Sequence, residues 1–257
     1  MYKGFNLKVE DDYFSAWSGH GLRLHERNKA SVESTLDKYF DDDGVISAAK
    51  VTQSWFPSIS ADVFISHSHA DSDAAVGLAG WLDEKFGLKA FIDSTVWGYS
   101  ENLLKKFDNK YCWNKESKTY NYDKRNKTTS HVNIMLSAAL HNMIDTAECV
   151  IFLNSPNSVT CKGYVTNEAT HSPWIFSEIS MTQLIEPRLR RKTTLLRKAM
   201  ESNEVHAQDM AIKYDISLNH LTEIDGGDLD QWRRSVRLSS TRGPETLDTL
   251  YDLHGLI

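Results

Sequence analysis

The feature that most constrains this chain is a series of short apolar runs that alternate with helical patterns from residue 61 onward. The runs are Asp62–Ser66, Leu88–Asp93 and Glu148–Leu153. Continuous apolar runs of this length are typical of strands that are buried on both faces. Strands that alternate with helices predict an α/β fold, in which a parallel sheet carries helices on both faces.

The segments between these runs carry signals for helix ends. Ser72 is expected to cap the first helix, and Gly87 is expected to end it. Ser172 caps a later helix with Pro173 at its first position, which is a favoured arrangement. Further helices are expected at His131–Met143, Leu229–Arg237 and Glu245–His254, and a fourth, half-exposed strand at Met210–Ile216.

Residues 1–60 are predicted to form an N-terminal helical extension to a domain that spans residues 61–257. An amphipathic helical stripe is formed there by Val32, Leu36, Tyr39 and Phe40. The acidic run that follows, ending at Gly44, is interpreted as the end of this helix. A calcium loop is disfavoured because Lys50 would occupy its last ligand position, where a carboxylate is required.

Composition and charge exclude several classes of protein. The chain has 257 residues, a net charge of −6 and three cysteines without CxxC spacing. This predicts a cytoplasmic protein without a disulfide framework, a metal site or a membrane span. An acidic chain is, as a whole, also a poor candidate for non-specific binding of nucleic acid.

In open parallel sheets, ligands bind beyond the carboxyl ends of the strands. In this chain those ends are Ser66–Asp71, Asp93–Ser100 and Asn154–Pro156. The strand pattern therefore predicts a ligand site formed by these segments.

Trp174 and Glu178 are four residues apart on the helix that begins after Ser172, so they share one helix face. An indole beside a carboxylate suits a substrate in which a flat ring is joined to a sugar. The ring packs against the indole, and the carboxylate stabilises positive charge at the anomeric carbon. The alternative is a core tryptophan with a glutamate that faces solvent.

Three segments together resemble the Toll/interleukin-1 receptor (TIR) domain. They are Asp62–Ser68, Phe91–Asp93 and Ser172–Glu178, which match its first box, the end of its second strand and its glutamate helix. The resemblance implies a flavodoxin-like sheet and cleavage of the nicotinamide–ribose bond of NAD+, which is a substrate and not a cofactor. Bacterial members of this kind act in anti-phage defence, where ADP-ribose and its cyclic isomers serve as signals.

The resemblance also implies roles for individual residues. Glu178 becomes the catalytic carboxylate, with Trp174 beside it in the substrate site. The other positions that correspond to substrate contacts are Ser66, His67, Ser68, His69, Asp93, Trp97 and Gly98. Trp97 and Gly98 correspond to a loop that closes over NAD+. TIR enzymes work as assemblies, so a homo-oligomer is expected, along with a downstream effector that senses the product.

The segment 109–130 is interpreted as an inserted β-hairpin. It carries six basic and two acidic residues, and aromatic residues alternate on either side of a polar turn. We hypothesise that it shields the substrate site or contacts the NAD+ pyrophosphate. A solvated hairpin with its aromatic residues packed on the domain, or a platform for single-stranded nucleic acid, are the alternatives.

A second basic run, Arg188–Lys198, is either a solvated helix face or a subunit contact. Two other functions use the same kind of fold. One is a TIR scaffold without catalytic activity, which signals through homotypic contacts. The other is a different N-glycosidase, such as a nucleoside deoxyribosyltransferase. The product of NAD+ cleavage is not fixed by the sequence.

Overall fold

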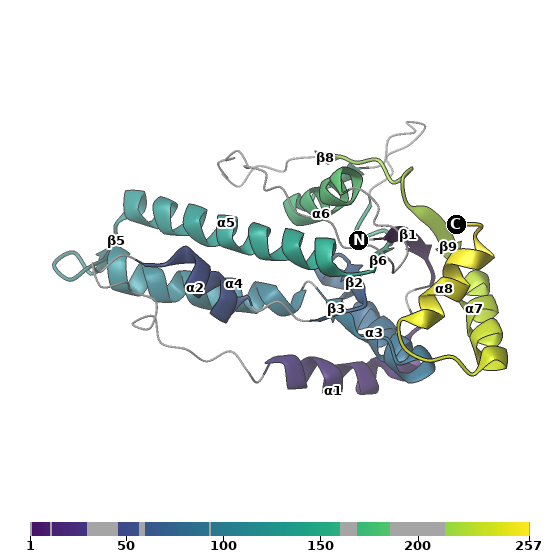
Figure 1. Ribbon diagram of the computed structural model, residues 1–257. Coiled ribbons are helices and arrows are strands. Elements are labelled where there is room, and N and C mark those ends of the chain that lie inside the picture. Colours follow the sequence, from purple (N-terminus) through teal and green to yellow (C-terminus); the bar gives the residue numbers. More distant parts are fainter. Residues whose placement is uncertain are drawn as a thin grey trace. The chain divides into compact units, whose positions relative to one another are not determined.

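The computed structural model describes residues 2–10, 12–29, 46–56, 60–92, 94–159, 169–185 and 214–256. The chain divides into two compact units (Figure 1). The first unit comprises Met1–Leu22, Ser60–Ile92 and Ile144–Ile257, and the second comprises Arg23–Ile59 and Asp93–Met143.

The first unit is built on a five-stranded parallel sheet with the order β3-β2-β6-β1-β9. Three of its strands confirm the predicted ones, and their bounds are β2 (Val63–Ser66), β3 (Ala90–Ile92) and β6 (Cys149–Leu153). The remaining two are β1 (Lys3–Lys8) and β9 (Thr222–Asp225). An α/β unit with this sheet is compatible with a flavodoxin-like fold.

Strand β1 corrects the prediction that residues 1–60 are a helical extension. It lies inside the sheet and pairs with β6 on one side and β9 on the other. Phe5 and Leu7 are completely buried on one face. Because Gly4 and Asn6 alternate with them, the strand lacks the continuous apolar run that marked the others. Helices α1 (Ser18–Lys29) and α2 (Ala48–Trp55) follow it, and the predicted helix at 32–40 with its acidic end lies outside the described residues.

The predicted fourth strand is confirmed where the structure describes it, and it lies outside the central sheet. Residues 210–213 lie outside the described residues, and Tyr214–Asp215 form β8, which pairs antiparallel with β7 (Ala169–Thr170). The strand that joins the central sheet is β9 instead. It contributes one buried apolar side chain, Ile224, in four residues, so its sequence gives a weak strand signal.

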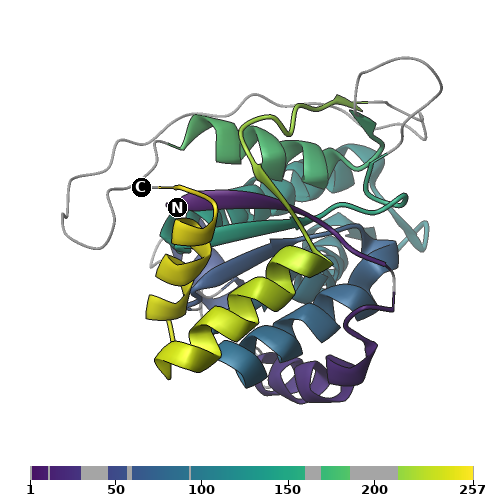
Figure 2. The same ribbon diagram turned by 90° about the vertical axis from the view of Figure 1, so that its right-hand side faces the viewer.

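Helices cover both faces of the sheet in the first unit, as predicted (Figure 2). One face packs against η1 (Ser15–Trp17), α3 (Ser72–Phe86), α7 (Gly226–Ser239) and α8 (Glu245–Leu253). At its centre Phe86 stacks on Trp232 with ring centroids 3.8 Å apart, and the edge of Trp81 contacts both rings. The opposite face packs against α6 (Pro173–Leu184), where Phe152 contacts a cluster that includes Ile175 and Ile179.

The predicted helix ends are confirmed at two of three places. Gly87 ends α3 with a φ of 72°, a left-handed conformation that favours glycine. Ser172 caps α6 by accepting a hydrogen bond from the Ile175 amide, and Pro173 is the first helical residue. Ser72 is not a cap. A short 3-10 helix, η3 (His69–Asp71), precedes α3 and leaves Asp71 at the capping position without a capping side-chain bond.

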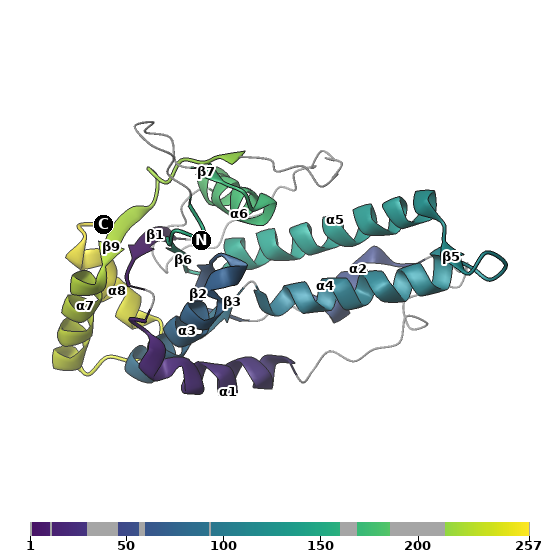
Figure 3. The same ribbon diagram turned by 180° about the vertical axis from the view of Figure 1, so that it is seen from behind.

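The second unit contains a pair of helices joined by a short hairpin. Helices α4 (Ser94–Phe107) and α5 (Tyr122–Thr146) lie side by side, and α5 continues three residues beyond the bounds of the unit (Figures 1 and 3). They are connected through η4 (Asp108–Cys112), β4 (Trp113–Asn114) and β5 (Thr119–Tyr120). The predicted hairpin is thus confirmed at its centre, while the residues from Tyr122 onward are helical and extend the predicted helix 131–143.

The buried side of α5 has the spacing of an amphipathic helix. Its buried apolar residues are Val132, Met135, Leu136, Ala139, Leu140 and Met143. Ile134 and Ala138, two further apolar residues of this helix, are exposed. They lie on the opposite side of the helix from the buried stripe. Within the described ranges, no helix combines the length and the apolar character needed to cross a membrane.

Candidate functional site

The carboxyl ends of β2 and β6 lie side by side at a point where the chain leaves the sheet in two directions. After β2 it forms α3 on one face, whereas after β6 it continues to α6 on the other face. Adjacent strands whose connections diverge in this way leave a crevice at their carboxyl ends, which is where open parallel sheets bind ligands.

Glu178 is at this edge of the sheet. Only 2% of its surface is exposed, and its Oε2 accepts a hydrogen bond of 2.5 Å from the Ser66 hydroxyl. Ser66 is the last residue of β2 and is itself buried. The glutamate that the sequence left open as a solvent-facing residue is therefore buried and faces the end of the first predicted strand.

The packing of α6 explains why this glutamate is held against the sheet. Ile175 and Ile179 anchor the helix on Phe152, and Glu178 shares their side of the helix. Near the C-terminal end of α6, Thr182 Oγ1 lies 2.8 Å from His220 Nε2. The Thr182 hydroxyl donates to the Ile179 carbonyl, and the direction of its bond with His220 depends on the tautomer of the ring. Burial lowers the pKa of His220, which favours the neutral ring.

The other residues predicted from the first unit are distributed along the same edge. Trp174 is partly exposed and lies one turn before Glu178 on the same helix face. His67 is buried, Ser68 is partly exposed, and His69 is exposed at the start of η3. The structure thus places His67, Ser68 and His69 directly after β2, next to the Glu178–Ser66 pair, with Trp174 one helical turn away on α6.

A buried carboxylate that the sequence did not single out joins the two loops of this edge. Asp71 accepts hydrogen bonds from the Ser155 hydroxyl at 2.5 Å and from the Asn157 side-chain amide at 2.7 Å. The Ser155 oxygen in turn accepts the backbone N–H groups of Asn157 and Ser158. The loop after β6 is therefore fixed against the start of α3. Both segments were predicted to lie at the ligand edge, but their contact depends on tertiary structure.

Asn6 is a second polar residue that the sequence analysis missed. It lies opposite Phe152 in the pairing of β1 with β6, and Phe152 lies opposite Ser66 in the pairing of β6 with β2. These three residues therefore form one row across the sheet on the α6 face. Asn6 is 4% exposed, and its Oδ1 has no hydrogen-bond partner among the described residues. The missed signal was a polar residue between two apolar ones in an extended segment.

The predicted loop at Trp97 and Gly98 is wrong, because both residues lie within α4 in the second unit. Leu103 and Phe107 are buried at helical spacing farther along α4, and no proline interrupts the segment, so the helix extends through these positions. Asp93 lies outside the described residues.

In the part of the chain that the structure describes, cysteines and metal-ligating residues do not extend the site. Among the residues that the structure describes, no cluster of His, Cys, Asp and Glu has the arrangement of a metal site. Cys112 and Cys149 are buried thiols whose pKa is raised by burial. Cys161 lies outside the described residues.

Fold and site together define an α/β protein with a buried carboxylate at the carboxyl edge of a parallel sheet. In comparisons with known proteins, no family model, curated protein or solved structure matches this chain.

Proposed function

We propose that this protein is a TIR-type NAD+ glycohydrolase or ADP-ribosyl cyclase that cleaves the nicotinamide–ribose bond. The observation that supports this most strongly is the burial of Glu178 against Ser66 at the carboxyl end of β2. A carboxylate in a water-poor site interacts strongly with a developing positive charge. The breaking of a glycosidic bond creates such a charge on the sugar ring.

The chemistry requires little from the protein at the leaving group. The nicotinamide ring of NAD+ is cationic when bound to ribose and leaves as a neutral molecule, so no general acid is needed. Glu178 is proposed to stabilise the oxocarbenium-like transition state and to bind ribose hydroxyls. Ser66 would hold the carboxylate in position by its hydrogen bond, and Trp174 would pack near the nicotinamide ring.

The identity of the second reactant determines the product. Attack by water gives ADP-ribose, and attack by a nitrogen or hydroxyl of the same molecule gives a cyclic isomer. We propose that the product is a signal in anti-phage immunity, that copies of the chain assemble through TIR–TIR contacts, and that an effector protein senses the product. NAD+ would be the substrate, with no added cofactor.

The test is incubation of the purified full chain with NAD+, followed by mass spectrometry of the products. Wild type is expected to release nicotinamide together with ADP-ribose or a cyclic isomer. Glu178→Gln removes the charge at nearly constant shape, and Glu223→Gln is the matched control, because Glu223 is an exposed carboxylate on β9. Only the first substitution should abolish turnover.

The same measurement separates the two functions that this fold accommodates. A scaffold that signals by homotypic contact would assemble without consuming NAD+, and Glu178→Gln would leave its assembly unchanged. Wild-type assemblies that neither bind nor cleave NAD+ would favour the scaffold and contradict the proposed enzyme.

A further inference from the structure

The turn between α4 and α5 carries aromatic side chains on its surface. We define the hairpin tip as residues 110–127, which contain the strands β4 and β5 and the first turns of α5. Tyr122 is 76% exposed and Trp113 is 43% exposed, and Tyr120 pairs with Trp113 across the two strands. Aromatic side chains usually pack in the interior, so three exposed ones at a single turn are typical of a binding surface.

The hairpin tip is also basic in an acidic chain. Residues 109–130 carry six basic residues against Glu116 and Asp123, which is an excess of +4 in a chain of −6. Five of the basic residues are exposed lysines, namely Lys110, Lys115, Lys118, Lys124 and Lys127. Positive charge is therefore concentrated beside the exposed rings, and a negatively charged partner is favoured there.

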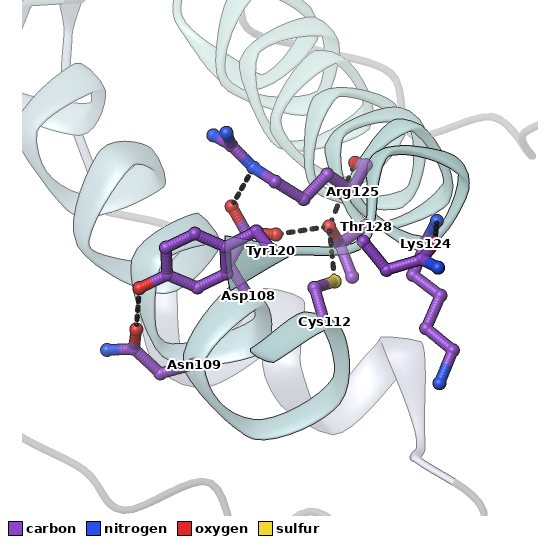
Figure 4. A network of polar contacts seen from close by, with 8 residues as sticks. Asp108, Asn109, Cys112, Tyr120, Lys124, Arg125 and Thr128 are labelled. Carbon is purple, nitrogen blue, oxygen red and sulfur yellow. Dashed lines mark hydrogen bonds and ion pairs between the residues drawn. The ribbon is translucent and has the colours of Figure 1, made fainter. Parts of the chain in front are cut away.

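A network of polar contacts centred on the buried Asp108 lies at the base of the hairpin tip (Figure 4). Asp108 is buried and accepts hydrogen bonds from Arg125 Nε at 2.9 Å and from the Thr128 hydroxyl at 2.6 Å. The Tyr120 hydroxyl donates to the Asn109 side-chain oxygen, and the Arg125 guanidinium lies 5.5 Å from the centre of the Tyr120 ring. The Tyr120 ring is thus held in place, and Trp113 packs on it with ring centroids 5.0 Å apart, which lowers the entropy cost of binding at these two rings.

We propose that the hairpin tip binds single-stranded nucleic acid. Unpaired bases would stack on the exposed faces of Tyr122 and Trp113, and the neighbouring lysines would contact the phosphates. Stacking on aromatic rings combined with basic contacts along the backbone is how proteins bind single strands without reading sequence. Duplex bases are already stacked and do not offer their faces, so a single strand fits this surface better than a duplex. The proposal is independent of NAD+ cleavage.

The test is fluorescence anisotropy with the full chain, using a labelled 20-nucleotide single strand of mixed sequence and the corresponding duplex. The single strand is expected to bind more tightly than the duplex, with an affinity that falls as salt increases. Tyr122→Ala and Trp113→Ala are each expected to weaken binding about 5- to 150-fold, as for the loss of one stacked base. Lys115→Glu with Lys118→Glu should weaken binding and reduce its dependence on salt.

Matched controls lie on α7 in the other unit. Arg234→Glu with Arg237→Glu reverses two exposed charges, and Leu238→Ala removes an exposed apolar side chain. These variants should bind as wild type does. Because the substituted tip positions are also exposed, all variants should keep the wild-type melting temperature, which confirms that they are folded.

Three results would overturn the proposal. One is a wild-type protein that does not bind the single strand. Another is a protein that binds the duplex, or the polyanion heparin, as tightly as it binds the single strand, because this would show only non-specific electrostatic attraction to polyanions. The third is unchanged binding by Tyr122→Ala and Trp113→Ala. Selective loss in these two variants, with unaffected α7 controls, would support it.

Discussion

Asn6 provides a stability test of the sheet edge that does not depend on catalysis. Its Oδ1 is buried without a hydrogen-bond partner among the described residues, and leaving a buried acceptor unsatisfied costs about 1–3 kcal/mol. Leucine has the same branching as asparagine but no polar atoms. Asn6→Leu is therefore expected to raise the free energy of unfolding by about 1–2 kcal/mol, after allowing for imperfect packing of the new side chain.

The assay is urea denaturation, supported by thermal melting. A gain of about 1 kcal/mol raises the melting temperature by roughly 2–4 °C in a chain of this size. The control is Asn157→Leu, which removes a hydrogen bond of 2.7 Å to Asp71 and should lower the free energy of unfolding by about 1 kcal/mol. The two substitutions are chemically identical, and opposite signs are expected because the exposed Asn157 donates to Asp71, whereas the buried Asn6 Oδ1 has no partner among the described residues.

A loss of more than about 1 kcal/mol in Asn6→Leu would refute this reasoning, because it would show that the amide makes a stabilising contact. The same variant also bears on the proposed site. Asn6 lies in the row of residues that begins at Ser66, and an unsatisfied acceptor at a ligand edge is available to a bound molecule. The more stable variant is therefore expected to bind NAD+ more weakly than wild type, which ligand-induced shifts in melting temperature would measure.

Three further predictions concern single residues. Gly77→Ala would place a Cβ 2.6 Å from the Phe14 carbonyl, so the free energy of unfolding in urea should fall by about 1–3 kcal/mol; an unchanged value would contradict the close packing. Ser66→Ala should leave the protein folded but lower kcat for NAD+ about tenfold, by releasing the Glu178 carboxylate; equal kcat would exclude a positioning role. Because the pKa of His220 is lowered in the folded state, the unfolded chain binds more protons near pH 6, and stability should fall as the pH drops from 7 through 6. His220→Gln should flatten that slope, and an unaltered slope would show that His220 does not cause it.

The sequence predicted elements whose residues are apolar at every position. Val63–Ile65 and Val150–Leu153 are buried on both faces of the sheet, so their identity as strands is visible without any tertiary information. Strand β1 has apolar residues only at alternate positions, on the face of the sheet that is opposite α6. Gly4 and Asn6 lie between them. It therefore resembles an exposed segment until its partners β6 and β9 are known.

The part of the site that could be predicted from the sequence is the set of side chains that share one face of α6, because helix periodicity determines which residues lie on the same face. Trp174 and Glu178 share a helix face because of their spacing, but whether that face points to the sheet or to solvent depends on how α6 packs on Phe152. The contact of Asp71 with Ser155 joins residues 84 positions apart and has no local signal. Trp97 was misplaced because its position was predicted from the resemblance to a loop of the TIR domain, whereas in this chain it lies within α4.

The most direct test of the central claim is the rate of nicotinamide release from NAD+, measured for wild type and for Glu178→Gln at equal concentration and in the same assembly state. If the buried carboxylate at the end of β2 stabilises the transition state, the substitution should lower kcat by at least about a hundredfold while the melting temperature of the protein changes little. Equal rates for the two proteins would contradict the account.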